Sequence, residues 1–372
     1  MVEALFWICA ALLVYTQLGY AVLLAALAKM KKPRPEGSDP EPEDAPSVSL
    51  VIAAYREEDV IAARVANARA LDYPGPVEVI VACDGSPDAT AQRARDAGAD
   101  LVLELPRGGK IRAQDQAVER ASGDVVAFSD ANALWEPDAL RALVAPFADP
   151  AVGYVCGQVR FVNEAGTNQE GLYWRYEMAL RGFESRLASV TGGNGAIYAT
   201  RRADYLVVDP VMGHDLSFPF NMVKRGRRAV YAPAARATEK MVPTVEGEFA
   251  RKRRMMSHAW PIVLRGGLLS PRGYSPLYAL MIFSHRILRY AAPFLHVAVL
   301  ALNLALLGQG AIYTVTLVLQ LALLLAAALP GRLRALLVAR YYVLTNASIA
   351  LGLVDWLRSG TPAHWSPPEG TR

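Results

Sequence analysis

Hydrophobic residues gather at the two ends of the chain, and the first run predicts a membrane-spanning helix. Residues 4–28 contain no charged side chain and are long enough to cross a bilayer. Only Glu3 precedes this run, whereas lysines and an arginine follow it between Lys29 and Arg34. A cleaved signal peptide has its basic residues before the apolar run, so we expect a retained helix with residue 29 onward in the cytoplasm. A buried core helix is the alternative.

The middle of the chain has the pattern of an α/β domain, in which apolar runs alternate with segments of helical spacing. The strand-like runs are 47–54, 77–85, 100–105 and 124–130, and the helix-like segments are 57–71, 88–99 and 110–123. This alternation indicates a Rossmann-like, mostly parallel sheet with helices on both faces. Ligands bind at the carboxyl ends of the strands in such sheets. Polar clusters stand at three of these ends, at 55–57, 83–85 and 129–132.

The last third of the chain is apolar again. Residues 273–290 retain one histidine and two arginines among apolar residues, which favours an interfacial helix over a span. Two apolar runs follow, joined by a turn at Gly308–Gly310, and predict a hairpin of spans. A third run, 333–357, contains polar side chains, and its topology stays open.

These patterns divide the chain into six expected parts. They are an N-terminal transmembrane helix (1–28), a linker rich in proline and acid (29–46), an α/β domain (47–254), interfacial helices (255–290), transmembrane helices (291–357) and a C-terminal tail (358–372).

The composition argues against nucleic-acid binding, a disulfide framework and a zinc site. The formal net charge is only +4, and the basic cluster at 251–254 lacks the interleaved aromatic residues of a nucleic-acid surface, so no nucleic-acid partner is expected. The cysteines, Cys9, Cys83 and Cys156, are too scattered for a disulfide framework or a zinc site.

The strand-like run at 124–130 ends in an acid, and an amide follows two residues later. Alternate residues of a strand point to the same face, so Asp130 and Asn132 are expected to share a side of the sheet. Two oxygen-bearing side chains there suit a shared divalent cation, or they cap the helix that follows Pro137. The residues alone leave both interpretations open.

Seven motifs connect these candidates. In chain order they are VSLVIAAYREEDVI, VIVACDGSPDAT, RGGKIRAQDQAVERASGD, VVAFSDANALWEPDAL, TGGNGAIYATRR, VMGHDLSFPFNMVKRGRRAVYAPAA and EGEFARKRRMMSHAW. Each alone is also typical of an ordinary turn or helix start. In this order they resemble the membrane-embedded family 2 glycosyltransferases with a GT-A catalytic domain, similar to bacterial exopolysaccharide synthases of the poly-N-acetylglucosamine, chitin-oligosaccharide and cellulose type.

The resemblance implies a binding site for a nucleotide-sugar donor. The residues at the family's donor positions are Ala54, Tyr55 and Glu57 for the base and ribose, Asp84 for uracil, Lys110 for the phosphates, and Asp130 and Arg254 for the diphosphate. The first motif departs from the family pattern, because Ala53 and Arg56 replace its usual proline and asparagine.

The resemblance also implies a divalent cation, Mg²⁺ or Mn²⁺, at the fourth motif. The family carries Asp-x-Asp where this chain has Asp130 and Asn132. An asparagine still offers a carbonyl oxygen, and Mg²⁺ takes few protein ligands beside water and phosphate. We therefore expect both residues to be metal ligands, with Asp130 the stronger one.

On the acceptor side the resemblance assigns Asp215 as the catalytic base, because inverting transfer needs a carboxylate to take the proton of the acceptor hydroxyl. The residues expected near the acceptor are Gly193, Asn194, Gly195 and His214. The last motif departs most: by spacing, Arg251, Arg254 and Met255 stand where polymer synthases carry Gln-x-x-Arg-Trp, so only Arg254 matches the motif by which they dock a long polymer end.

Together these features lead us to expect an inverting, metal-dependent β-glycosyltransferase in the inner membrane, multi-pass, with its catalytic domain in the cytoplasm. It would transfer a hexosyl or N-acetylhexosaminyl group from a UDP-sugar to an extracellular polysaccharide. One alternative is single-sugar transfer to a polyprenyl-linked glycan. Another is a catalytically degenerate, nucleotide-binding scaffold. Besides donor and acceptor, the expected partners are membrane lipid and a membrane subunit that supplies further spans.

Overall fold

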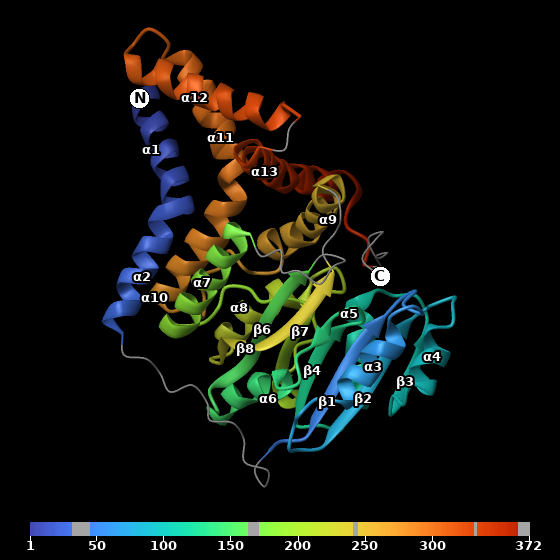
Figure 1. Ribbon diagram of the computed structural model, residues 1–372. Coiled ribbons are helices and arrows are strands. Elements are labelled where there is room, and N and C mark those ends of the chain that lie inside the picture. The colour runs from blue at the N-terminus through green and yellow to red at the C-terminus, as the bar shows by residue number, and fades with distance from the viewer. Residues whose placement is uncertain (32–44, 163–170, 241–244, 331–332, 364–372) are drawn as a thin grey trace.

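The computed structural model describes residues 1–31, 45–162, 171–240, 245–330 and 333–363. Most of the linker expected at 29–46 lies outside these described residues, as does the end of the expected tail at 358–372. The described residues form an α/β domain beneath a group of long helices (Figure 1).

A mixed sheet forms the centre of the α/β domain. Among the described residues it has eight strands in the order β3-β2-β1-β4-β7-β6-β8-β5. Their bounds are β1 Val48–Ala54, β2 Val77–Asp84, β3 Leu101–Leu105, β4 Val125–Asp130, β5 Leu134–Trp135, β6 Val152–Val162, β7 Ile197–Arg201 and β8 Arg228–Lys240. Strands β1 to β4 pair in parallel, as do β6 and β8, whereas β7 and β5 are antiparallel to their neighbours. The expected mostly parallel sheet is confirmed.

Helices cover both faces of the sheet. They are α3 Ile61–Arg69, α4 Thr90–Asp96, α5 Lys110–Arg120, α6 Ala139–Val144 and α8 His214–Lys224, with short 3₁₀ turns at Ala145–Ala148 and Arg202–Asp204. In β1, Leu50 and Ile52 pack into one core with α3, α4 and α6, and Val51 packs into the other core with α5 and α8. Because both faces of β1 are covered by helices, its side chains on both faces are mostly apolar.

Four helices within the described ranges are long and apolar enough to cross a membrane. They are Val2–Met30 (α1 Val2–Val14, a π-helical turn Tyr15–Gly19 and α2 Tyr20–Met30), Pro276–Ala305 (α10 Pro276–Ile282, a π-helical turn Phe283–Ile287 and α11 Leu288–Ala305), α12 Ala311–Ala328 and α13 Arg334–Ser359. Helices α1 and α11 lie side by side (Figure 1). Below them, α7 (Leu172–Leu187) packs against α2.

The boundary expected at residue 290, between the interfacial segment 273–290 and the span after it, is absent from the structure. That segment forms the first half of the continuous helix Pro276–Ala305, with no break at residue 290. The reason is that its charged side chains have partners inside the protein: Arg289 pairs with Glu177 of α7, and His285 lies 2.6 Å from a Glu184 oxygen. Internal partners remove much of the cost of placing charge in an apolar helix.

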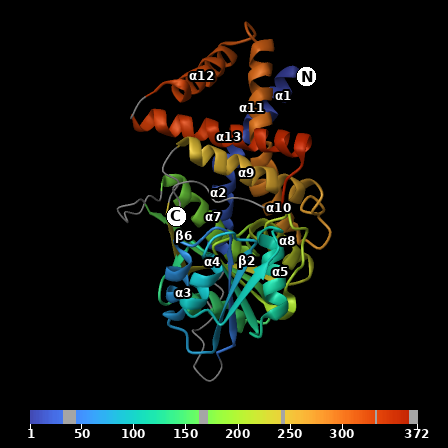
Figure 2. The ribbon, with the colours of Figure 1, turned by 90° about the vertical axis from the view of Figure 1, so that its right-hand side faces the viewer.

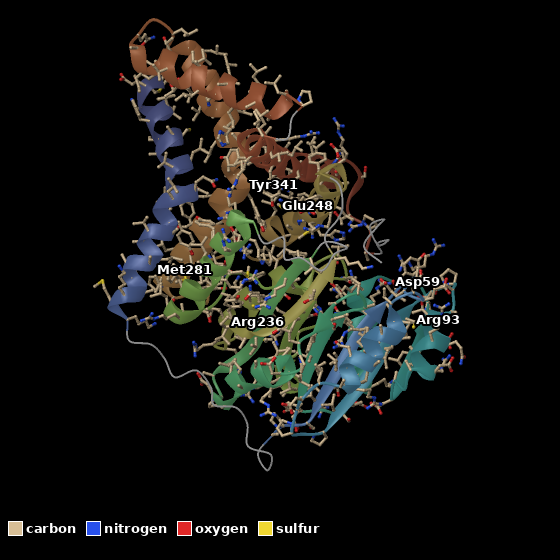
Figure 3. All side chains as sticks on the ribbon, in the orientation of Figure 1. Asp59, Arg93, Arg236, Glu248, Met281 and Tyr341 are labelled. Atoms are coloured by element: carbon tan, nitrogen blue, oxygen red, sulfur yellow. The ribbon has the colours of Figure 1, made fainter. Side chains whose placement is uncertain are left out.

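Helix α9 (Val245–Leu264) crosses the boundary expected at residue 254 and packs along α13. Both run crosswise to α11 (Figure 2). The indole nitrogen of Trp260 donates to the Ile349 carbonyl at 2.9 Å, and Lys252 donates to the hydroxyl of Tyr341 at 2.6 Å. Figure 3 shows Tyr341 of α13 above Glu248 of α9.

Candidate active site

The carboxyl ends of β1, β2 and β4 bring the predicted donor residues to one edge of the sheet. At the end of β2, the buried carboxylate of Asp84 accepts from the backbone nitrogens of Gly108 and Gly109 at 2.6 and 2.9 Å. Arg107 donates to its other oxygen at 2.7 Å. Asp84 therefore holds the glycine loop that precedes Lys110.

Tyr55 lies beside this loop. The Arg107 guanidinium lies 3.2 Å from the centroid of the Tyr55 ring, so the ring has a cation against its face. Gly85 makes the close approach possible, because its φ is +65° and an added Cβ would lie 2.8 Å from the Arg107 nitrogen. The planar Tyr55 ring is suited to a nucleotide base, and Arg107 links it to the Asp84 carboxylate, which the loop nitrogens already bond.

Two other predicted donor residues lie behind this surface. Ala54 is buried at the end of β1, and the Glu57 side chain is also buried. The Glu57 backbone nitrogen donates to Thr90 Oγ1 at 2.9 Å, which ties the loop after β1 to α4. Between them, Arg56 has φ +54°, a conformation in which the chain turns sharply. Ala54 and Glu57 thus shape the loop that carries Tyr55.

Lys110 joins the donor side of the site to the predicted acceptor loop. From the first residue of α5, its ammonium group donates to the Asp130 carboxylate and to the carbonyl oxygen of Gly195, the latter at 3.2 Å. Lys110 and Asp130 are about a quarter exposed, at 20% and 27% of their side-chain surface, so solvent and ligands can reach this pair. A cation, an acid and a glycine loop therefore meet at one point.

The Asp130–Asn132 stretch does not continue the strand, which corrects the expectation that alternation puts both side chains on one face. Strand β4 ends at Asp130, and the Ala133 nitrogen donates to the Asp130 carbonyl at 3.3 Å, closing a turn. At the start of α6, the N-cap residue Asp138 makes no capping hydrogen bond with its side chain, and Glu136 pairs with Arg160 at 2.8 Å.

The acceptor loop is bound tightly to the first turn of α8. The Gly193 nitrogen donates to the Asp215 carbonyl at 2.6 Å, and an added Cβ on Gly193 would lie 2.0 Å from the Tyr154 hydroxyl. Asn194 braces the next position, because its amide donates to the Gly157 carbonyl at 2.6 Å and its oxygen accepts from the Ile197 nitrogen at 2.9 Å. The backbone of Asp215, whose side chain is half-buried, is therefore bonded directly to the loop.

His214 was expected to face the acceptor, but the structure places its ring behind the site. It is 2% exposed, and its Nδ1 lies 2.8 Å from the Tyr198 hydroxyl. Rings of Phe128, Tyr205 and Phe218 surround it. Burial, together with the nearby Lys110 charge, holds the pKa of His214 well below its ordinary value.

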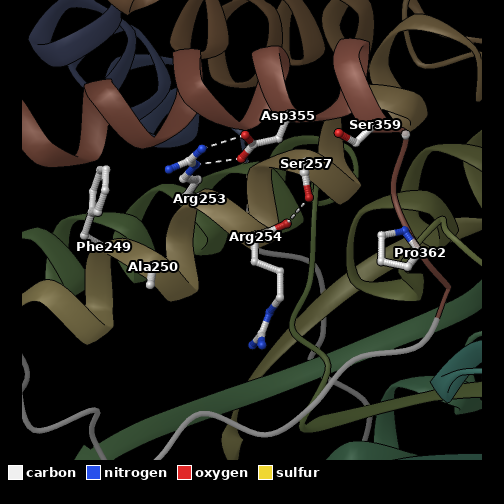
Figure 4. A pocket seen from close by; sticks show the side chains of 9 residues that line it. Phe249, Ala250, Arg253, Arg254, Ser257, Asp355, Ser359 and Pro362 are labelled. Atoms are coloured by element: carbon white, nitrogen blue, oxygen red, sulfur yellow. Dashed lines mark hydrogen bonds and ion pairs between the residues drawn. The ribbon is translucent and has the colours of Figure 1, made fainter.

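Helix α9 carries Arg254 over this edge. Figure 4 shows Arg254 pointing away from α13, whereas Arg253 pairs with Asp355 through two contacts of 2.6 Å. Both arginines line a pocket of about 420 Å³ between α9 and the end of α13. Four residues further along α9, His258 Nδ1 lies 3.1 Å from the Val211 carbonyl, just before α8. Burial lowers the pKa of both Arg254 and His258.

Comparison with known proteins decides the family. A family model described as Glycosyl transferase family 2 matches residues 49–205. An N-acetylglucosaminyltransferase of Mesorhizobium japonicum is 29% identical over 245 residues, which cover 59% of this chain and 57% of that protein. An N-acetylglucosaminyltransferase of Rhizobium leguminosarum bv. trifolii is 32% identical over 134 residues, 34% of this chain and 73% of that protein. The chain belongs to glycosyl transferase family 2.

A solved structure shares the fold of this family 2 glycosyltransferase. The mannosyltransferase PcManGT from Pyrobaculum calidifontis, in complex with GDP-Man and Mn²⁺, matches with a TM-score of 0.72 at 22% identity, over 96% of this chain and 99% of that chain. At this identity the likeness confirms the expected GT-A fold alone. The chain spans little more than half the length of the Mesorhizobium relative, 57%.

The residues at the end of β4 fit a divalent cation only with help from a substrate. Within the described residues, no group of three or more histidine, cysteine or acidic side chains could hold a metal ion. Asp130 and Asn132 would offer one carboxylate and one amide oxygen, and Mg²⁺ commonly completes such a set with phosphate and water. The partial exposure of Asp130 leaves it open to that exchange.

Sequence reasoning missed Arg64 of α3, which lies under the Asp130 turn in this glycosyltransferase. It is 0% exposed, its Nε donates to Ser129 Oγ at 2.9 Å, and Ser129 Oγ donates to the Asp130 carbonyl at 2.9 Å. Burial lowers the pKa of Arg64 to about 9. The signal was an arginine at a core-facing position of an otherwise apolar helical pattern.

Proposed function

We propose that the chain is an inverting β-glycosyltransferase that uses a UDP-sugar donor and a divalent cation at the cytoplasmic face of the membrane. The observation that supports this best is the loop Gly193–Gly195. At one end it is bonded to Asp215, the proposed base, and at the other end to the Lys110–Asp130 pair, the proposed diphosphate site. The same three-residue loop is thus bonded to both the proposed base and the proposed leaving-group site.

The reaction assigns a role to each group. Asp215 takes the proton from the acceptor hydroxyl as its oxygen attacks the anomeric carbon from the face opposite the diphosphate. The carbon–oxygen bond to the diphosphate breaks, and its electron pair leaves with UDP. Lys110 and Arg254 offset the charge that develops on the leaving group. A divalent cation held by Asp130 and Asn132 would supply further charge neutralisation.

The donor residues are proposed to divide between base and phosphates. Tyr55 and Asp84 would bind the base, with Ala54 and Glu57 shaping the loop behind them. His214 would support Asp215 from beneath rather than touch the acceptor, because it is buried. The relatives named N-acetylglucosaminyltransferases favour an N-acetylhexosaminyl group as the sugar. The proposed task is extension of an extracellular polysaccharide.

A second candidate, single-sugar transfer to a polyprenyl-linked glycan, is favoured by the last motif. Arg251, at the position of the family's glutamine, is held by Glu248 at 2.8 Å and does not extend toward a polymer. Met255, at the tryptophan position, is 47% exposed and offers no aromatic platform for a sugar ring.

We further propose that α1, α11 and α12 cross the inner membrane and that α13 lies on its cytoplasmic surface. Helix α9 carries four consecutive basic residues, 251–254, and lies in the interface better than in hydrocarbon. Because α13 is bonded to α9 through Arg253–Asp355, Trp260–Ile349 and Lys252–Tyr341, it shares that position. The C-terminus is then cytoplasmic.

The test is incorporation of labelled UDP-sugars by membranes that contain wild-type protein or Asp215→Asn, with Mn²⁺ or Mg²⁺ present. We expect product from wild type and a loss of at least about 100-fold in the variant, as for removal of a general base. Equal product from both proteins would rule out Asp215 as the base. No product from any UDP-sugar would favour the scaffold, and the mass of the product separates polymer from single addition.

A further inference from the structure

A buried polar network joins the acceptor loop to the membrane helices. Its centre is Glu184 of α7, which is 0% exposed. One Glu184 oxygen accepts from Tyr20 of α2 at 2.7 Å and lies 2.6 Å from His285 Nδ1. The other oxygen accepts from both the backbone nitrogen and the hydroxyl of Thr191 at 3.0 Å. Glu184 therefore bonds to two membrane helices and to the loop.

Thr191 begins the glycine loop of the site. Its hydroxyl also accepts from Nε of Arg286 at 3.0 Å, and an added Cβ on Gly192 would lie 2.3 Å from Nη2 of the same arginine. Two residues later, Gly193 donates to the Asp215 carbonyl, and two residues after that, Gly195 accepts from Lys110. Thr191 therefore anchors the loop at one end, while the catalytic contacts hold its other end.

The membrane side of this network has an unusual backbone. Each of the two helices that supply its residues contains a π-helical turn, at Tyr15–Gly19 and Phe283–Ile287. The turns face each other, because the Tyr15 hydroxyl lies 2.8 Å from Ser284 Oγ. The hydroxyl of Tyr176 in α7 donates to the Gln17 carbonyl inside the first turn at 2.9 Å. Single π turns inside α-helices often mark functional sites.

We infer that Thr191, Glu184 and Arg286 are positioning residues for sugar transfer, which hold the acceptor loop and Asp215 in place through the hydrogen bonds at Thr191. This inference rests on the proposed function, because it assigns the loop to the acceptor. The three residues touch neither substrate nor the reacting atoms. They act through the backbone of residues 191–193, where a shift of about 1 Å is enough to lower turnover strongly.

The decisive comparison is Thr191→Val against Thr191→Ser. Valine has the shape of threonine but lacks the hydroxyl that joins Arg286 to Glu184, whereas serine keeps it. We expect Thr191→Val to lower kcat/KM for the acceptor roughly tenfold, as for loss of a hydrogen bond to charged groups. UDP affinity should stay within about twofold, since Asp84 and its loop hold the base independently. Thr191→Ser should restore the acceptor kcat/KM.

Tyr15→Phe is the matched control. It removes a hydrogen bond between the same two helices at the same level without touching the loop, and should leave both constants unchanged. Hydrogen–deuterium exchange over residues 190–196 gives a readout without activity: exchange should accelerate in Thr191→Val and Arg286→Met, and stay at the wild-type rate in Tyr15→Phe.

Wild-type exchange and wild-type acceptor kinetics in Thr191→Val would overturn the inference, whether or not the transferase assignment holds. Equal losses in Thr191→Val and Thr191→Ser would also overturn it, since the hydroxyl would then be irrelevant. If wild type forms no product from any donor, the proposed function fails, and the exchange measurement still decides whether the network positions the loop.

Discussion

The ammonium group of Lys110 at the start of α5 lies against the carboxylate of Asp130 at the end of β4. Both groups are partly exposed, so the contact can exchange for others when a ligand arrives. A diphosphate with its cation would offer Lys110 new anionic partners and offer Asp130 a new cation. The two charges thus offset each other before a donor binds, and Asn132 adds no charge to the pair.

The Asn132→Asp substitution tests the cation site directly. A second carboxylate raises the negative charge of the ligand set, which strengthens binding of a divalent ion. We expect the Mn²⁺ concentration for half-maximal activity to fall by roughly tenfold, because the affinity of such a site rises with the number of its charged ligands. The measurement is a metal titration of sugar transfer at saturating donor. The control is Asp138→Asn, which changes a charge nearby but outside the turn and should leave the metal titration as in wild type. If Asn132→Asp also gives the wild-type titration, Asn132 has a structural role only.

Arg64→Met tests whether the buried arginine supports the Asp130 turn. The variant keeps the apolar stem of the side chain but loses the bond to Ser129, which itself bonds to the Asp130 carbonyl. Stability should change by less than about 1 kcal/mol, since an apolar side chain avoids the cost of burying a charge whose hydrogen bonds go to the neutral side chains of Ser129 and Asn67. Donor binding, measured by titration, should weaken several-fold.

The control for Arg64→Met is Arg69→Met on the same helix. Arg69 makes a surface ion pair with Asp100 at 40% exposure of both side chains, and such pairs contribute little. Neither stability nor donor binding should change in that variant. A large loss of stability in Arg64→Met with normal donor affinity would show that the arginine serves the core and not the site.

Much of this arrangement could be predicted from the sequence because local pattern determined it. The apolar runs at 47–54 and 124–130 became β1 and β4, and the carboxyl ends of parallel strands necessarily meet at one edge. Asp84, Lys110 and Asp130 therefore converged as expected. The turn after Asp130 was missed because strand alternation was extended two residues too far, past the point where a backbone hydrogen bond turns the chain.

What the sequence could not provide were partners distant along the chain. The histidine and arginines within 276–305 suggested an interfacial helix, since their acidic partners in α7 lie about a hundred residues earlier. His214 looked like an acceptor contact because it precedes Asp215, but consecutive residues at a helix start point in different directions. Its neighbours Phe128 and Tyr198 come from two separate strands.

The buried His214 predicts how stability depends on pH. Burial lowers its folded-state pKa well below the unfolded value of 6.5, so the unfolded chain takes up a proton that the folded chain excludes. Stability should therefore fall as the pH drops through 6.5, with a slope of up to about 1.4 kcal/mol per pH unit from this group. His214→Gln, which can still accept from the Tyr198 hydroxyl, should flatten that slope in thermal unfolding measured between pH 7 and 5. Parallel curves for wild type and variant would contradict the assignment.

The position of α13 leads to the sharpest prediction about topology. By length and composition the helix Arg334–Ser359 could cross a membrane, but its side chains are bonded along the basic helix α9. A span cannot lie beside a helix that carries four consecutive basic residues without placing those charges in hydrocarbon. Fluorescent protein and alkaline phosphatase, fused after Arg372, report opposite sides of the membrane. We expect fluorescence and no phosphatase activity, which places the C-terminus in the cytoplasm.

The same reporters inserted after Gln309, in the turn between α11 and α12, supply the control. That turn should lie outside, so phosphatase should be active there and the fluorescent protein dark. Active phosphatase at both positions would show that α13 crosses the membrane, and the α9–α13 contacts would then have to open on insertion.

Asp355→Asn separates these cases further. Because the substitution weakens the pairing with Arg253, it should loosen α13 from α9 and increase protease cleavage near residue 360 from the cytoplasmic side only.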